Sequence, residues 1–446
     1  MAGKWQNALR GLVVASLLIV AVAMPVRALT ILRDPDIENA LNELAKPMIA
    51  AAGLPANRIK ILVVRDSKLN AFVVDTGHVL IHSGLILKLK SAEELQAVIA
   101  HELAHIANGH ITRRLANQRV AGGAARFGML LALAVGAGTG NTEAAAGIAL
   151  GSANSAQRLF FANTRAEEAS ADQAALRYMA LNGIDPTAMS RVLDYFRGQE
   201  ALSAARQDPY ARSHPLTRDR IRAVQGYAAA YKDTARDNPK ANYWFARVKG
   251  KMGAFLQNPG FTLRKIAKND TSDIATMRRA IAYHRSSNTA KALTEINKLT
   301  SQRPNDPFYQ ELRGQILLES RNFQAAVAAY GRAVNLAPKN ALVLAGYGRS
   351  LLAVNTRASN AKALRTLEQA RARDGRDPRM MRDLATAYAR AGNNGMASVT
   401  TAERYAILGD LKNAAIHAKR AAGLLPQGST GWNRAQDVMN AARTAG

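Results

Sequence analysis

The sequence predicts an α+β domain, mostly helical with a small sheet, followed by an all-α module of helical repeats. Three observations lead to this prediction. Short apolar runs lie between residues 58 and 82, amphipathic helical patterns flank them, and Pro304 and Pro338 are 34 residues apart. At 446 residues the chain is too long for one ordinary core, and 48% hydrophobic with 21% charged residues is a globular composition.

The amino terminus has the plan of an export signal. Lys4 and Arg10 precede an uncharged apolar run over 11–24, and Pro25 and the sequence Val-Arg-Ala over 26–28 follow it. The run is shorter than the roughly 20 residues that span a bilayer. We therefore expect a signal peptide over 1–28, cleaved after Ala28, and, for a bacterial protein, a periplasmic location. An uncleaved anchor in the inner membrane is the alternative.

The first folded module is expected over residues 29–240. Its predicted elements are a helix over 36–52, strands over 58–66, 71–74 and 79–82, and helices over 92–115, 165–181 and 186–196. Ser91 and Glu94 form a capping box at the start of the 92–115 helix. Residues 120–155 are rich in Gly and Ala, and we expect there either a packed hydrophobic hairpin or a mobile, membrane-touching flap.

Residues 101–105 read HELAH and lie within the predicted 92–115 helix. Two histidines four residues apart project from one face of a helix and can share one metal ion. Glu102 is then well placed to touch a water at that metal. The chain has no cysteine, so the remaining ligands must be histidine or carboxylate. We expect one Zn²⁺ per chain, bound by His101 and His105.

A carboxylate is the expected third ligand. Glu168 and Asp172 are four residues apart on a predicted helix and face the same way, so Glu168 can bind the metal while Asp172 hydrogen-bonds a ligand imidazole. Glu167 points elsewhere on that helix. The metzincin pattern fails because positions 108 and 111 are Asn and Ile, and His110 lies on another helical face, where we expect a structural role.

These motifs resemble the HtpX-like peptidases, which share a superfamily with the CAAX prenyl endopeptidases. Besides HELAH, the resemblance is carried by residues 70–85, by 164–172 and by Ser-His-Pro at 213–215 with an Arg further on. It implies a gluzincin-type zinc metallopeptidase with His101, His105 and Glu168 on the metal and Glu102 as general base. The departures are a Thr at 164, where the family usually has Ser, and the segment 120–155, which does not align.

His214 and Arg220 take their expected roles from the same resemblance. In family members with this order of modules, the equivalent of His214 is implied to occupy the fourth position on zinc and restrain activity, so we expect a latch. A hydrogen-bond donor to the oxyanion and a loop-stabilising histidine are the alternatives. Arg220 is expected to fix this loop or pair with an acidic residue near the site.

The strand formed by Val79, Leu80, Ile81 and His82 is expected to be an exposed edge of the sheet. An extended peptide could pair there as an added strand. Such pairing would select unfolded substrates without reading much of their sequence.

The second module is expected over 273–446, after a linker over 241–272. Gly314, Leu317, Ala326, Tyr330 and Ala333 fall where the tetratricopeptide pattern needs a small residue, a large apolar one, Ala, an aromatic and Ala. Weaker copies lie on both sides, and a later helix pair is expected over 397–408 and 411–424. Each unit buries its apolar face only by stacking on its neighbours.

The charge is strongly basic, and most of it lies in the repeats. The formal net charge is +27, and residues 241–446 carry 32 Lys and Arg against 13 Asp and Glu, a net of +19. Such a surface fits acidic proteins or a membrane surface, and the absence of any recognition motif speaks against nucleic acid.

Two functions follow from the residues and the resemblance together. The first is a periplasmic zinc endopeptidase that degrades misfolded or stalled outer-membrane proteins. The second is a chaperone or assembly factor for outer-membrane β-barrel proteins, whose repeats bind clients or the β-barrel assembly machinery while the protease activity is latched or secondary.

Overall fold

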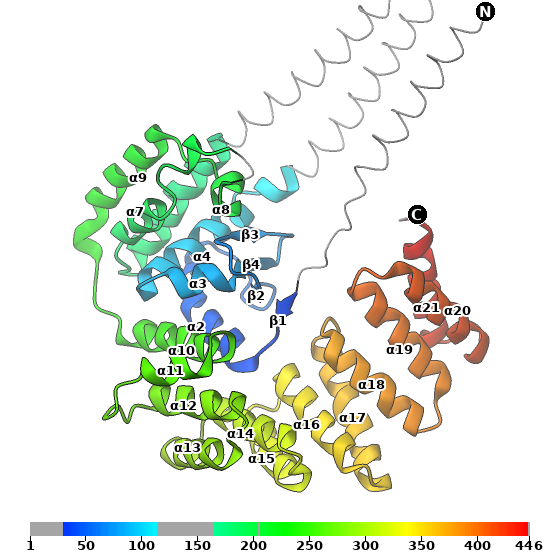
Figure 1. Cartoon of the computed structure of the whole chain (residues 1–446). Coiled ribbons are helices and arrows are strands. Elements are labelled where there is room, and N and C mark those ends of the chain that lie inside the picture. The colour runs from blue at the N-terminus through cyan, green and yellow to red at the C-terminus, as the bar shows by residue number, and fades with distance from the viewer. Residues whose placement is uncertain (1–29, 114–164, 204–205, 445–446) are drawn as a thin grey trace, which may run out of the picture. The chain divides into compact units, whose positions relative to one another are not determined.

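The computed structural model describes residues 30–113, 165–203 and 206–444 (Figure 1). The expected signal peptide and the Gly/Ala-rich segment 120–155 lie outside these residues. Within the described ranges, no helix is both long and apolar enough to cross a membrane. The predicted fold class is confirmed, because a small mixed sheet with helices is followed by helical repeats.

A four-stranded sheet in the order β1-β2-β4-β3 is the centre of the first module. β2 (Lys60–Val64) and β4 (His78–His82) run parallel, with Ile61 opposite Val79. The short strands β1 (Ile31–Leu32) and β3 (Ala71–Val73) pair antiparallel on the two outer sides. The buried side chains of this sheet share one core with α2 (Pro35–Ala51) and α4 (Ala92–Ala107), which Figure 1 shows beside the strands.

The expectation that residues 79–82 form an exposed edge is wrong. β4 pairs with β2 on one side and with β3 on the other, so it is an interior strand. Its side chains explain this position: Val79, Leu80 and Ile81 are all buried, and a strand covered on both faces belongs inside a sheet. The edge strand on this side of the sheet is β3, and no described strand pairs with its outer side.

α4 carries the two motif histidines and is shorter than predicted. Ser91 accepts a hydrogen bond from the Glu94 amide at 3.3 Å, while the Glu94 carboxylate accepts from the Lys90 amide, so only half of the capping box forms. The helix ends at Ala107 and not near residue 115, because Gly109 adopts a φ of 69°, which favours glycine. The chain is helical again over 110–113.

The other helices of the first module surround α4 and the sheet. They are α3 (Ser83–Lys88), a helix over 165–181, α7 (Thr187–Asp194), the short α8 (Pro209–Ser213) and α9 (Arg218–Tyr231). The helices predicted over 165–181 and 186–196 are therefore present, the second slightly shorter than expected.

Residues 241–272 are not a linker in the structure. α10 (Pro239–Leu256) packs against α2 of the first module and α12 of the second, and α11 (Pro259–Arg264) follows it. The guanidinium of Arg247 lies 2.7 Å from Asp36 and 2.6 Å from Asp306, so one buried side chain joins both modules. Two of the charges of this segment, Arg247 and Lys251, are buried in ion pairs.

The repeats are successive antiparallel helices, each packed on the next. They are α12 (Asp273–Arg285), α13 (Thr289–Gln302), α14 (Pro307–Glu319), α15 (Phe323–Leu336), α16 (Ala341–Val354), α17 (Arg357–Arg373), α18 (Pro378–Arg390), α19 (Asn394–Ile407), α20 (Leu411–Leu424) and α21 (Thr430–Thr444). The predicted pair at 397–408 and 411–424 corresponds to α19 and α20.

The Tyr330 ring explains the glycines of the repeat pattern. It is buried on α15, between Gly314 of α14 and Gly346 of α16. A methyl group on Gly314 would lie 2.6 Å from the ring and one on Gly346 would lie 2.3 Å from it. Three consecutive helices can approach this closely only because both positions lack a side chain.

A cavity of about 770 Å³ lies between the start of the described chain, α10 and the repeats. Its lining combines apolar side chains such as Phe255 and Leu318 with charged ones, among them Arg33, Arg349, Arg379 and Glu311.

Candidate metal centre

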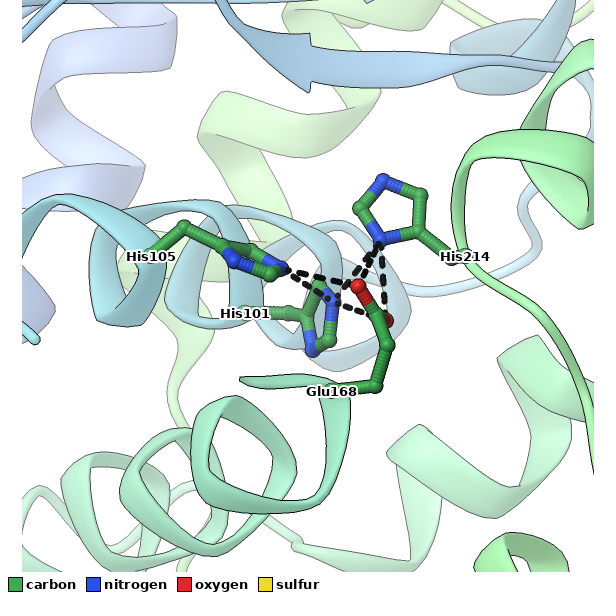
Figure 2. A group of neighbouring side chains, drawn as sticks. All are labelled: His101, His105, Glu168 and His214. Atoms are coloured by element: carbon green, nitrogen blue, oxygen red, sulfur yellow. Dashed lines mark hydrogen bonds and ion pairs between the residues drawn. The ribbon is translucent and has the colours of Figure 1, made fainter. Parts of the chain in front are cut away.

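His101 and His105 face the same side of α4, as the four-residue spacing predicts (Figure 2). Both are buried, and their Nε2 atoms are 3.1 Å apart. Two imidazole nitrogens directed at a common point in a buried site are the arrangement expected of metal ligands.

Glu168 completes this group from the 165–181 helix. Its carboxylate oxygens lie 3.3 Å from Nε2 of His101 and 3.4 Å from Nε2 of His105. Glu167, which the helical spacing rejects as a ligand, is also buried, and its carboxylate lies 3.8 Å from the guanidinium of Arg113. The structure therefore brings together the three side chains that the sequence analysis selected as ligands.

The outer nitrogen of each imidazole also has a neighbour. Nδ1 of His101 lies 2.9 Å from Asp172, the carboxylate expected to orient it. Nδ1 of His105 lies 2.9 Å from Nδ1 of His110, and Nε2 of His110 lies 3.1 Å from the Ser170 hydroxyl. The bend at Gly109 turns His110 back towards His105, which the spacing on a straight helix does not indicate. These contacts fix both rings with Nε2 turned inward.

This donor set fits a zinc ion. The ligand atoms of His101, His105, Glu168 and His214 all lie within 4.8 Å of one another and all four residues are buried. Two imidazoles with one carboxylate are a donor set that zinc peptidases use, and such sites leave one position for water or substrate.

Arg220 joins the acidic residues to the loop that follows α8. Its guanidinium lies 2.6 and 2.9 Å from the two oxygens of Asp172 and 2.9 Å from Glu168. It also donates to the carbonyl oxygens of His214 at 3.2 Å and Pro215 at 3.3 Å. Both contacts expected of Arg220, with the loop and with an acid at the site, are therefore present.

His214 enters the group from the opposite side (Figure 2). Its Nδ1 lies 3.0 Å from Glu168 and 3.2 Å from Nε2 of His101. Its Nε2 lies 3.3 Å from the Ala71 carbonyl oxygen and 3.4 Å from the Glu102 carboxylate. The ring thus lies where a fourth ligand would, while the latch itself stays a prediction.

The charges in the group favour a bound cation. Burial lowers the pKa of His101, but Asp172 and Glu168 outweigh burial and raise it to about 10. Burial raises the pKa of Glu168, but His214, His101 and Arg220 hold it well below its usual range. The pKa of Asp172 is lowered in the same way, since Arg220 outweighs burial. Glu168 and Asp172 are therefore ionised at neutral pH, and their negative charges would favour a cation at this site.

The sequence analysis missed Tyr210, which lies beside the group. Its side chain is buried, its ring centroid is 4.6 Å from that of His214, and its amide donates to the Leu69 carbonyl at 3.2 Å. Burial, followed by the Glu102 carboxylate, raises the pKa of the Tyr210 phenol well above its usual value. Its position one helical turn before His214 is the signal that could have found it.

Known proteins match both modules. Residues 32–228 match the model of Peptidase family M48, and residues 271–405 match a tetratricopeptide repeat model. A putative beta-barrel assembly-enhancing protease of Vibrio cholerae is 29% identical over 260 residues, which are 51% of this chain and 50% of that protein. The beta-barrel assembly-enhancing protease of Yersinia pestis is 24% identical over 300 residues, 66% of this chain and 61% of its own.

A third relative matches a smaller part of this chain. The mitochondrial metalloendopeptidase of Schizosaccharomyces pombe is 26% identical over 188 residues, 42% of this chain and 51% of that protein. The match to a solved tetratricopeptide protein of Thermus thermophilus covers 38% of this chain and 100% of that protein, at 16% identity and a TM-score of 0.26. The chain spans about half the length of the first curated relative it matches.

Proposed function

Because this chain contains a Peptidase family M48 domain followed by tetratricopeptide repeats, we propose that it is a zinc-dependent endopeptidase of the periplasm that degrades misfolded or stalled outer-membrane proteins. The observation that carries the proposal is the buried group of His101, His105 and Glu168, with Glu102 one residue beyond the first histidine. The names of the Vibrio and Yersinia relatives support the choice of outer-membrane β-barrel proteins as substrates.

His101, His105 and Glu168 would hold the zinc ion. When bound, zinc supplies Lewis-acid activation of a water molecule and of the peptide carbonyl. Glu102 takes the proton of the attacking water and returns it to the leaving amine. Asp172 keeps Nε2 of His101 turned inward, and Arg220 keeps Asp172 in place.

β3 is the strand that would accept an extended substrate. The Asn70 carbonyl and the Val74 amide bond to β4, so the alternate backbone groups, those of Ala71 and Val73, face outward. The Ala71 carbonyl is 3.3 Å from His214, which places this edge beside the candidate ligands. A peptide pairing there would be bound through hydrogen bonds of its backbone, so its binding would depend little on its sequence.

His214 would act as a latch. Its Nδ1 lies among the candidate ligands and its Nε2 at the outward carbonyl of β3, so its departure would free both a metal position and a substrate-pairing group. We expect His214→Ala to be more active than wild type on an unfolded substrate.

A second function, as chaperone or assembly factor, is favoured by the 770 Å³ cavity beside the repeats. Its mixture of apolar and charged side chains fits a segment of a client or of the β-barrel assembly machinery. The net charge of +19 over residues 241–446 would favour an acidic partner or a membrane surface, and no nucleic acid is expected as a partner.

The test is degradation of an unfolded outer-membrane β-barrel protein by the purified protein, with and without a zinc chelator. Glu102→Gln should lower the cleavage rate by about 10²- to 10⁴-fold, because the general base is lost while the fold is kept. Glu93→Gln, on the same helix, is the matched control and should cleave at the wild-type rate.

Cleavage that resists the chelator or survives in Glu102→Gln would contradict the peptidase proposal. Absence of cleavage in wild type and in His214→Ala, with the client kept soluble, would favour the chaperone function. Mass spectrometry of the mature amino terminus tests export separately, and a chain that begins at Leu29 would exclude the retained anchor.

A further inference from the structure

Three aromatic rings form a stack that ends at the candidate metal centre. The rings of Phe196 and Tyr210 are 4.6 Å apart at an interplanar angle of 27°, and those of Tyr210 and His214 are 4.6 Å apart at 32°. All three side chains are buried. Offset aromatic pairs at this separation attract one another beyond the area that they bury.

The backbone of His214 is held by contacts that leave its side-chain torsions free. The His214 amide donates to the Tyr210 carbonyl at 2.8 Å, and Arg220 holds the His214 carbonyl at 3.2 Å. Neither bond restricts rotation of the imidazole. The imidazole contacts Glu168 through Nδ1 and the Ala71 carbonyl oxygen through Nε2, both at its edge. A ring packed against its face adds a support that these two edge contacts do not supply.

Tyr210 is suited to give that support because it is itself fixed. Phe196 covers one face of its ring, and its amide donates to the Leu69 carbonyl, just before β3. The imidazole of His214 therefore rests on a ring that is anchored to both the helical core and the sheet.

We propose that Tyr210 is a positioning residue for His214: its ring holds the imidazole with Nδ1 directed at the metal ligands and sets how readily His214 leaves them. This inference rests on the proposed metallopeptidase function and concerns regulation of the same site. One aromatic contact of this kind changes an equilibrium by roughly two- to twelvefold. Losing it should raise the fraction of molecules with His214 displaced by that factor.

The experiment uses the purified protein stripped of metal and loaded with Co²⁺, whose visible absorption reports its ligands and geometry. Tyr210→Leu should move the spectrum towards that of His214→Ala, because the support of the imidazole is lost. Tyr210→Phe keeps the ring and should keep the wild-type spectrum. Phe196→Leu, which removes only the backing of Tyr210, should produce a smaller shift in the same direction.

Tyr195→Leu is the matched control for a general loss of packing. Its ring lies in the same domain, but its hydroxyl bonds to Glu94 at 2.9 Å, away from the metal centre. It should lower the unfolding midpoint without moving the Co²⁺ spectrum.

Wild-type spectra for both Tyr210→Leu and Phe196→Leu, beside a changed spectrum for His214→Ala, would overturn the positioning role. A His214→Ala spectrum equal to wild type would overturn it as well. A failure of the proposed function looks different: the wild type would then bind no stoichiometric Co²⁺, or Glu168→Gln would bind it unchanged.

Discussion

Replacing Arg220 with Met tests whether one cation holds the metal centre together. The guanidinium is 5% exposed and touches Asp172 through two nitrogens, Glu168 through a third contact, and two carbonyl oxygens of the loop at 214–215. Met has a similar length and no charge, so the substitution removes these contacts while it largely fills the space.

The expected cost follows from the partners that are left behind. Breaking a buried ion pair by removing one partner destabilises a protein by about 3–5 kcal/mol, since the other charge stays buried. Without Arg220, burial raises the pKa of Asp172 and loosens its contact with His101. Loss of a contact that orients a metal ligand lowers metal affinity by roughly 10- to 100-fold. We therefore expect Arg220→Met to be destabilised and to bind zinc more weakly by that factor.

The assay is competition for Zn²⁺ with a chelating dye, together with urea unfolding of the metal-free protein. Arg222→Met is the matched control: Arg222 lies on the same helix, its side chain is 78% exposed, and its guanidinium lies 3.9 Å from the exposed carboxylate of Asp219. A surface change of this kind should alter stability by at most about 0.5 kcal/mol. Zinc affinity within twofold of that control would refute the role given to Arg220.

Two further predictions concern the repeats. Gly346→Ala should destabilise the protein by about 1–3 kcal/mol in urea unfolding, because its methyl group would lie 2.3 Å from the confined Tyr330 ring. Gly331→Ala is the control. Its added methyl group would lie 3.8 Å from the nearest atom, so the helix should be stabilised by about 0.5–1 kcal/mol. Equal urea midpoints for the two variants would contradict the packing argument. The other prediction concerns Glu311. Burial raises its pKa, and the charges of Asp34 and Asp36 add to this effect while Lys251 opposes it, so that the pKa is about 8 in the folded protein and 4.5 in the unfolded chain. The free energy of unfolding should therefore fall as the pH rises from about 4.5 to 8. Glu311→Gln should remove this pH dependence and raise the urea midpoint at pH 8.5. Glu319→Gln is the control, because the pKa of Glu319 is lowered in the folded protein and this residue causes no loss of stability between about pH 4.5 and 8. An unchanged pH dependence in Glu311→Gln would exclude Glu311 as its source.

Much of the metal centre could be predicted because its residues share faces of helices. A spacing of four places His101 with His105 on α4, and Glu168 with Asp172 on the 165–181 helix, before any tertiary contact is known. The same holds for the repeats, where Gly314 and Tyr330 take their places from the 34-residue period.

The errors arise where a position depends on residues distant in the sequence. The strand at 79–82 lies inside the sheet because β2 and β3 flank it. The pattern of apolar and polar residues along a strand does not indicate which strands pair with it. Residues 241–272 were predicted to be a linker, but most of α10 lies there, and its Arg247 pairs with Asp36, which is 211 residues away in the sequence.

The sequence by itself determined the local periodic features of this protein: the helical face that carries HELAH, the co-facial carboxylates and the register of the repeats. Only the tertiary structure decided that β3 is the edge strand, that α10 joins the modules through buried ion pairs, and that Tyr210 supports His214. The physical reason is the sequence distance over which each kind of interaction acts. Helical and strand periods act over a few residues, whereas burial and charge pairing are settled when segments far apart in the chain come together.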